Sequence, residues 1–268
     1  MRLLPCLGDL RNHGAMMLSF WRSSLLLAIL ALVSLGLGAC DGLMALGAPT
    51  DRFVVKPASD RVSAQLAADI EVSRTIVRKR LEGLGLTVHR IEPTGQGELT
   101  IEVSGPRAED AFAAAFGIKG DLAIRLVDLN AVPADVAQGI APVGSELLEM
   151  TDGSGPVAVR RVGGISGDRL ADARTGIDEF TNQPMVMVSF DEAGARKFAL
   201  LTQANVGKPL AIVLDGKVLS APVINEPILG GHAQISGGYT QETANQMAIA
   251  LRSGALPVAF TLVEHTRM

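Results

Sequence analysis

The sequence predicts an α+β fold in two parts: a ferredoxin-like βαββαβ base and a second α+β head. Short stretches of alternating apolar residues predict the strands, and apolar residues at three- and four-residue steps predict the helices. A stretch spaced by Gly and Pro at residues 132–156 separates the two sets of elements. With 268 residues, of which 48% are hydrophobic, the chain is long enough to bury a core in each part.

Residues 52–129 form the predicted base. Its clearest helix has apolar residues at helical spacing and is closed by Gly83 and Gly85. Two strands follow as a hairpin around a turn at 93–97, and Pro106 opens the second helix. The predicted base elements are strands at 52–57, 87–92, 98–103 and 122–126 and helices at 66–84 and 106–117.

Residues 130–257 form the predicted head, and residues 258–268 form a return strand and tail. Asp191 and Thr240 are candidate N-caps of two helices, and Ser166 is a candidate N-cap of a shorter one. The dipeptide Asp215-Gly216 predicts a two-residue hairpin turn. The predicted head strands lie at 157–162, 185–190, 210–214 and 218–219, and the return strand at 257–264.

Two short connections would join base and head under this division. One lies near Asn130 and Pro133, and the other lies near Gly254 and Pro257, which stop the last helix. Two short connections allow one part to rotate against the other with little change inside either. These four residues are therefore the predicted hinge.

The N-terminal segment has the pattern of a secretory signal. Residues 24–39 are uncharged and follow Arg22, but they are too few to cross a bilayer as a helix. The ending Leu37-Gly38-Ala39-Cys40 resembles the bacterial lipoprotein signal, in which the cysteine is lipidated and becomes the new N-terminus. We therefore predict a signal peptide at 1–39, with Met16 or Met17 as the alternative start residue, and a lipidated tether at 40–51.

Two alternatives to lipidation of Cys40 stay open: a plain signal peptide cut near Ala39, and a short anchor that is left uncut. Lipidation predicts a bacterial periplasmic protein held on the lipid bilayer through its N-terminus. The protein would then be a membrane-anchored lipoprotein.

Charge and composition exclude several classes of function. The chain carries 24 Lys and Arg against 28 Asp and Glu, and this net negative charge does not favour binding to nucleic acid. Its two cysteines, Cys6 and Cys40, both precede the folded part, which excludes a disulfide framework or a cysteine metal site there. No nucleophile, metal or cofactor motif accompanies His89, His232 or His265. We expect no catalytic residue, no metal and no cofactor, and therefore no enzyme.

Two further patterns admit more than one interpretation. The basic set Arg74, Arg78, Lys79 and Arg80 could favour an anionic membrane surface, but nearby glutamates favour a solvated helix face. The apolar stretch 185–188 could be an adaptable peptide-binding surface, although uninterrupted apolar strands usually have both faces covered. We predict a solvated face and a buried strand.

Four segments of the second part resemble, in order and spacing, the head of the first periplasmic domain of the SecD preprotein-translocase subunit. They are 211–216 (AIVLDG), 220–224 (SAPVI), 235–237 (ISG) and 251–257 (LRSGALP). The helix end at 78–85 and the segment 126–128 are similar to the base of the same domain. The resemblance covers about residues 52–264. It implies motif residues that are mainly structural: Asp215, Gly216, Ser220, Pro222, Gly237 and Arg252.

The resemblance implies a non-enzymatic, membrane-anchored periplasmic module that contacts translocating or newly exported, unfolded polypeptides beside the Sec translocon. Its partners would be that polypeptide, the membrane subunits of the translocon and the lipid bilayer. SecD continues into membrane helices, whereas this chain stops at Met268, so we expect a lipoprotein-like stand-alone form without the transmembrane bundle. The alternative is a periplasmic envelope lipoprotein of the same fold that acts as a ligand-binding protein or enzyme.

Overall fold

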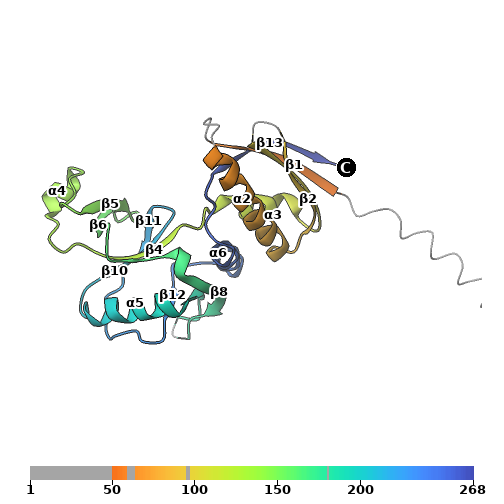
Figure 1. Cartoon of the computed structure of the whole chain (residues 1–268). Coiled ribbons are helices and arrows are strands. Elements are labelled where there is room, and N and C mark those ends of the chain that lie inside the picture. The colour runs from red at the N-terminus through yellow and green to blue at the C-terminus, as the bar shows by residue number, and fades with distance from the viewer. Residues whose placement is uncertain (1–49, 59–63, 95–96, 180) are drawn as a thin grey trace, which may run out of the picture. The chain divides into compact units, whose positions relative to one another are not determined.

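The computed structural model describes residues 50–58, 64–94, 97–179 and 181–268 (Figure 1). The predicted signal peptide, the lipidation at Cys40 and residues 41–49 of the tether lie outside the described residues. The first strand begins at Thr50, so the last two residues of the predicted tether belong to that strand. Among the described residues, no helix combines the length and apolar character needed to cross a membrane.

The predicted α+β class is confirmed, and the base has the order β-α-β-β-α-β. Its strands form one antiparallel sheet with the order β13-β1-β3-β2. Helices α2 and α3 pack against each other and cover one face of that sheet (Figure 1). The base elements are β1 Thr50–Pro57, α2 Ala64–Gly83, β2 Thr87–Thr94, β3 Glu98–Ser104, α3 Ala108–Gly117 and β13 Phe260–Arg267.

The base core lies between the sheet and its two helices. A stack of three rings crosses it: Phe53 lies 3.9 Å from Phe112 on one side and 4.3 Å from His265 on the other, between ring centroids. His265 also hydrogen-bonds to the buried Asp51 at 2.8 Å. Because Phe53 belongs to β1 and His265 to β13, this stack joins the first strand of the base to its last.

The prediction that residues 122–126 complete the base sheet is wrong. That strand, β4 Leu122–Leu126, pairs antiparallel with β10 Leu210–Leu214 in the head. The fourth strand of the base is β13, which pairs with β1 from the other end of the sequence. The head is therefore inserted between α3 and β13. The alternating pattern shows that β4 buries one face, but it does not show which core receives that face.

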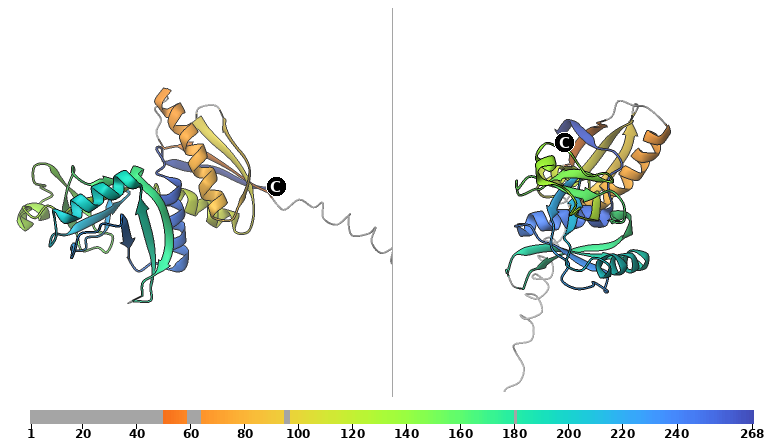
Figure 2. Two further views of the ribbon diagram at one scale, coloured as in Figure 1. Left: turned by 60° about the horizontal axis from the view of Figure 1, so that its bottom comes forward. Right: turned by 90° about the vertical axis from the view of Figure 1, so that its left-hand side faces the viewer.

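The head contains two larger sheets and a hairpin. The first sheet has the order β11-β10-β4-β7, the second has the order β12-β9-β8, and β5 pairs with β6. Helix α6 packs against β8 and β9, and α5 packs against β9 and β7 (Figure 2). The remaining head elements are α4 Pro133–Ala137, β5 Ser145–Glu149, β6 Pro156–Arg160, β7 Ile165–Ser166, β8 Leu170–Ile177, β9 Pro184–Phe190, α5 Glu192–Gln203, β11 Lys217–Ser220, β12 His232–Ile235 and α6 Gln241–Ser253.

Three local predictions for the head are confirmed: the two helix N-caps and the two-residue hairpin turn. The Asp191 carboxylate accepts the Gly194 N–H at 2.6 Å and caps α5. The Thr240 hydroxyl accepts the Thr243 N–H at 3.1 Å at the start of α6. Asp215 and Gly216 both have positive φ, at 53° and 79°, and connect β10 to β11 as a tight hairpin.

Two other predictions for the head need correction. Ser166 makes no capping hydrogen bond through its side chain, and only a 3-10 turn, Gly167–Arg169, follows it before β8. In the apolar stretch 185–188, Met187 is 41% exposed, whereas Val186 and Val188 are buried. The second sheet therefore packs one face on the core and turns the other outward.

Candidate functional site at the junction of base and head

The base consists of β1, α2, β2, β3, α3 and β13, and the head consists of the elements from β4 to α6. The chain passes between base and head twice, and these two connecting segments are called the crossings. The first crossing is the segment 118–121 between α3 and β4, and the second is the segment 254–259 between α6 and β13. They are bonded to each other, because the Leu256 N–H donates to the Lys119 carbonyl at 2.9 Å. Leu256 also packs into the base core. The two crossings thus lie side by side.

Arg80 binds both crossings from the base. Its side chain is fully buried, so the predicted solvated helix face is wrong for this member of the basic set, whereas Lys79 is exposed and Arg74 and Arg78 are partly exposed. The guanidinium donates to four backbone carbonyl oxygens. Nη1 bonds Ala115 at 2.8 Å and also Ile118, while Nη2 bonds Lys119 at 2.8 Å and Gly254 at 2.9 Å. One side chain of α2 therefore holds the end of α3, the first crossing and the end of α6.

The charge of Arg80 suits this position. Burial, partly offset by the negative charge of Asp215, lowers the pKa of Arg80 to about 10, so the group stays protonated at neutral pH. Its carbonyl partners at Ala115 and Gly254 lie at the C-terminal ends of α3 and α6, where the helix dipole favours a cation. The Nε atom has no hydrogen-bond partner among the described residues.

Asp215 binds the first crossing from the head. Its two carboxylate oxygens accept the N–H groups of Lys119 at 2.9 Å and Asp121 at 2.8 Å. The segment between them is closely packed. Gly120 is buried, has φ +87°, and a Cβ there would lie 2.9 Å from Arg80 Nη2. The first crossing is thus held between a cation of the base and an anion of the head.

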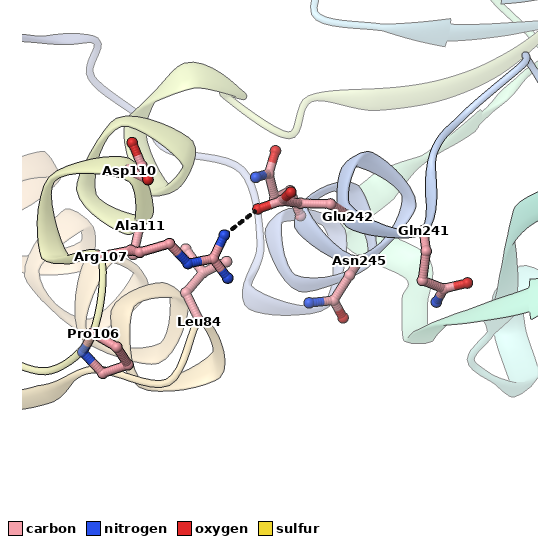
Figure 3. Close-up of a pocket in the computed structure, with 9 residues that line it drawn as sticks. Leu84, Pro106, Arg107, Asp110, Ala111, Gln241, Glu242 and Asn245 are labelled. Carbon is pink, nitrogen blue, oxygen red and sulfur yellow. Dashed lines mark hydrogen bonds and ion pairs between the residues drawn. The ribbon is translucent and has the colours of Figure 1, made fainter.

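A groove of about 390 Å³ lies between base and head near the N-terminal ends of α3 and α6, at the opposite ends of these helices from the two crossings. Arg107 on one side and Glu242 on the other point toward each other and form an ion pair of 3.2 Å (Figure 3). Their side chains are 71% and 62% exposed. Asp110, Asn245 and other lining residues add further polar groups to this groove.

The exposed ion pair should contribute little to stability. We expect Glu242→Gln, which removes the charge and keeps the side-chain volume, to lower the free energy of unfolding by less than about 0.5 kcal/mol. Urea unfolding at low and at high salt measures this, and salt should reduce the small difference further. A loss above about 1 kcal/mol would contradict the assignment of this pair as solvent-screened.

Comparison with known proteins identifies the family. A family model described as "SecDF, P1 head subdomain" matches residues 145–258. The chain is 36% identical to the protein translocase subunit SecD of Acetobacter pasteurianus over 208 residues, which is 77% of this chain and 39% of that protein. It is 35% identical to SecD of Rickettsia bellii over 214 residues, which is 80% of this chain and 41% of that protein.

Solved structures show the same relationship. The chain matches 98% of a SecDF structure titled as a membrane component that enhances protein export, with 31% identity, a TM-score of 0.61 and 80% of this chain covered. This chain belongs to the SecD family. It also matches 35% of SecDF in its super-membrane-facing form, with 27% identity, a TM-score of 0.65 and 91% of this chain covered. The chain spans about two fifths of the length of the curated SecD relatives.

The residues that resemble the SecD head motif do not form one cluster of functional groups. Asp215, with Gly216 in the same turn, reaches the junction. Ser220 ends β11, and the Pro222 carbonyl accepts the Leu210 N–H at 2.8 Å. Gly237 lies under the ring of Tyr239, whose Oη would be 2.8 Å from a Cβ there, and Arg252 is exposed in the last turn of α6.

The four predicted hinge residues fall in two places. Gly254 and Pro257 lie in the second crossing, and Gly254 accepts a hydrogen bond from Arg80. Asn130 and Pro133 lie beyond β4, inside the head, and Pro133 begins α4. The Asn130 N–H donates to the Asp128 carboxylate at 3.1 Å, and Ser145 Oγ donates to it at 2.6 Å. These bonds lower the pKa of Asp128, with Ser145 as the larger cause.

The three histidines of the SecD-like unit lie apart. His89 hydrogen-bonds to Ser104 at 2.7 Å within the base sheet, and His265 pairs with Asp51. His232 is exposed on β12 in the head. Within the described ranges, no three His, Cys, Asp or Glu side chains are grouped so that they could hold a metal ion.

Proposed function

We propose that this chain is a P1-type periplasmic module of Sec-dependent protein export that contacts exported polypeptides beside the translocon and catalyses no reaction. The observation that carries the proposal is the match to SecD and SecDF proteins through both base and head. One of the matched structures is titled as a component that enhances protein export. In this role the unit would present binding surfaces and would need no cofactor.

We place the module in the bacterial periplasm, held on the membrane by lipidated Cys40. The support is the uncharged segment 24–39 and the small residues before that cysteine. Intact-mass analysis tests this placement. We expect a mature protein that begins at Cys40 with acyl chains attached, and a Cys40→Ser variant that is released from membranes. An unmodified N-terminus at another residue would contradict it.

The function itself is tested by recovering the full chain from membranes in which export has been arrested. We expect translocon membrane subunits and unfolded secretory polypeptides to be cross-linked to the chain. The cross-links to secretory polypeptides should disappear when export substrates are absent. Recovery of the chain with a bound small molecule, and without either protein partner, would favour the ligand-binding alternative. A matched lipoprotein of unrelated fold serves as the control for anchoring alone.

We further propose that the head changes its orientation against the base at the crossings 118–121 and 254–259. The supporting contacts are concentrated on Arg80, Asp215 and the pair Arg107 and Glu242. A short bis-maleimide bridge between cysteines at positions 107 and 242 should slow export, while the two single-cysteine variants should not. Unchanged export with the bridge in place would contradict a moving junction.

A further inference from the structure

Strand β12 is one of the two edge strands of the second head sheet, whose order is β12-β9-β8. The Phe190 N–H donates a hydrogen bond to the Gly231 carbonyl. This bond shows which opposed residue pairs of β12 and β9 are hydrogen-bonded and which are not. In an antiparallel ladder such bonded pairs alternate with unbonded ones, so Ala233 and Ile235 turn their backbone groups toward β9. His232 and Gln234 therefore turn their N–H and C=O groups away from the sheet.

These outward groups are available for a partner. Among the residues that the structure describes, no backbone hydrogen bond links His232 or Gln234 to a segment on the free side of β12. Both residues are exposed. Unpaired edge groups of this kind are the template on which an additional strand can form.

An apolar cavity of about 310 Å³ lies along the same edge. It touches three consecutive residues of β12, 232–234, although consecutive side chains of a strand point to opposite faces. None of the residues that line it belongs to β9, the strand paired with β12 on its other side, so the cavity lies on the side of β12 that faces away from β9. The other lining residues are Ile124, Phe198, Leu210, Ile212, Pro222 and Ile228.

A second cavity, of about 330 Å³, touches the same three residues on the outer face of the sheet, where Met187 is exposed. The two faces differ in charge. The 310 Å³ cavity has no Lys, Arg, Asp or Glu in its lining, whereas the outer cavity includes Asp172 and Arg174. A strand placed beside β12 would thus direct alternate side chains into an uncharged apolar cavity and onto a polar face with a flexible methionine.

We propose that β12 binds an extended segment of an exported polypeptide by β-strand addition, with uncharged apolar side chains at alternate positions in the 310 Å³ cavity. The inference rests on the proposed function and adds the mode of recognition to it. Main-chain hydrogen bonds supply the affinity, so the site tolerates many sequences, as a module that meets many exported chains requires. An unfolded segment suits this site, because its backbone N–H and C=O groups are not already paired within a sheet or helix.

The test uses the full chain and a fluorescein-labelled nine-residue peptide of alternating Val and Thr with a Lys at each end. Two further peptides carry N-methyl groups on every second backbone amide. They differ in which of the two alternating sets of amides is methylated, and these two sets are called the two registers. Only one of the two registers points its amides at β12 in a bound strand. We expect methylation in that register to weaken binding by about tenfold or more and methylation in the other to change it by less than about threefold.

A matched pair of variants tests the protein side. Gln234→Pro removes an outward N–H that β9 does not use, and proline is tolerated at the edge of a sheet. Gln234→Ala removes the same side chain but keeps the N–H. We expect peptide affinity to fall about tenfold for Gln234→Pro and less than about twofold for Gln234→Ala, with similar melting temperatures for the two variants.

Each result decides between defined possibilities. Equal binding of both methylated peptides, or equal affinity of the two variants, overturns strand addition even if exported polypeptides still cross-link to the chain, so the proposed function survives. Absence of peptide binding together with cross-links elsewhere on the chain also overturns it. Absence of any cross-link to exported polypeptides means that the proposed function itself fails. If Gln234→Pro unfolds, the two methylated peptides decide the matter on the unaltered chain.

Discussion

Replacement of Arg80 by methionine is expected to lower the free energy of unfolding by about 3–5 kcal/mol. Methionine has a similar length but no donor, so the carbonyls of Ala115, Ile118, Lys119 and Gly254 lose a shared charged partner. Relief of the buried charge offsets part of this loss. Urea unfolding of the purified chain measures the difference.

The control for this prediction is Arg78→Met, on the same helix two residues earlier. The Arg78 side chain is 42% exposed and lies 3.8 Å from Glu82, so its loss should cost less than about 0.5 kcal/mol. Arg80→Lys should fall between the two, because an ammonium keeps the charge but lacks the planar fork that reaches several carbonyls at once. Equal costs for Arg80→Met and Arg78→Met would show that the buried guanidinium does not hold the junction.

The effect of Arg80→Met should not vary between pH 6 and pH 8. The pKa of Arg80 is lowered in the folded chain, yet at about 10 it remains above this range, so the group is protonated in both folded and unfolded states. Proton binding then does not differ between these states at this position, and the slope of stability with pH is unchanged. Unfolding at both pH values checks this.

Local sequence signals predicted local structure well. The helix spacing of Ile70, Val77 and Leu81 identifies a face that is buried against the base sheet. Asp191 and Thr240 start helices because their side chains accept N–H groups only three residues away. Each of these interactions depends on neighbours in the sequence, which is why residue types and spacing were sufficient.

Pairings between distant segments could not be predicted in the same way. Strand β4 directly follows α3, yet the strand that joins the base sheet is β13, more than a hundred residues later, with Phe260 opposite Pro57. An alternating pattern shows that a strand has one buried face and gives no information about the partner strand. Strands β8 and β12 contain small and polar residues, and they form because β9 supplies hydrogen bonds on both of its edges.

The helical spacing of Arg80 indicated that it lies near the buried face of α2, but the basic residues beside it favoured a solvated face. It lies three residues after Val77 and four before Leu84, at the border of the apolar stripe of α2, and helical neighbours at these spacings share a face. Its neighbours Arg78 and Lys79 made the segment resemble a solvated basic face. The four carbonyl acceptors come from α3, the first crossing and the end of α6, so they were not recognisable before the fold was known.

Substitution of Gly120 by alanine is expected to lower the free energy of unfolding by about 2–4 kcal/mol. Two causes add. Gly120 has φ +87°, where a Cβ is strained, and that Cβ would lie 2.9 Å from Arg80 Nη2 and 3.3 Å from the Ala250 carbonyl oxygen. The guanidinium must therefore move away from the carbonyls that it binds. Urea unfolding measures the loss, and the spacing between positions 107 and 242 reports any shift of head against base.

Gly153→Ala separates the two causes. Gly153 has φ +78°, close to that of Gly120, but a Cβ there meets no atom within 4 Å, so only the backbone strain of about 1–2 kcal/mol applies. The extra cost at Gly120 then measures crowding at Arg80. In an Arg80→Ala background that crowding disappears, and Gly120→Ala should cost at least about 0.5 kcal/mol less than in the unaltered chain. Equal costs for the two glycine variants, and no coupling to Arg80, would show that the first crossing moves away from the guanidinium without penalty. The segment 118–121 would then not be held between Arg80 and Asp215.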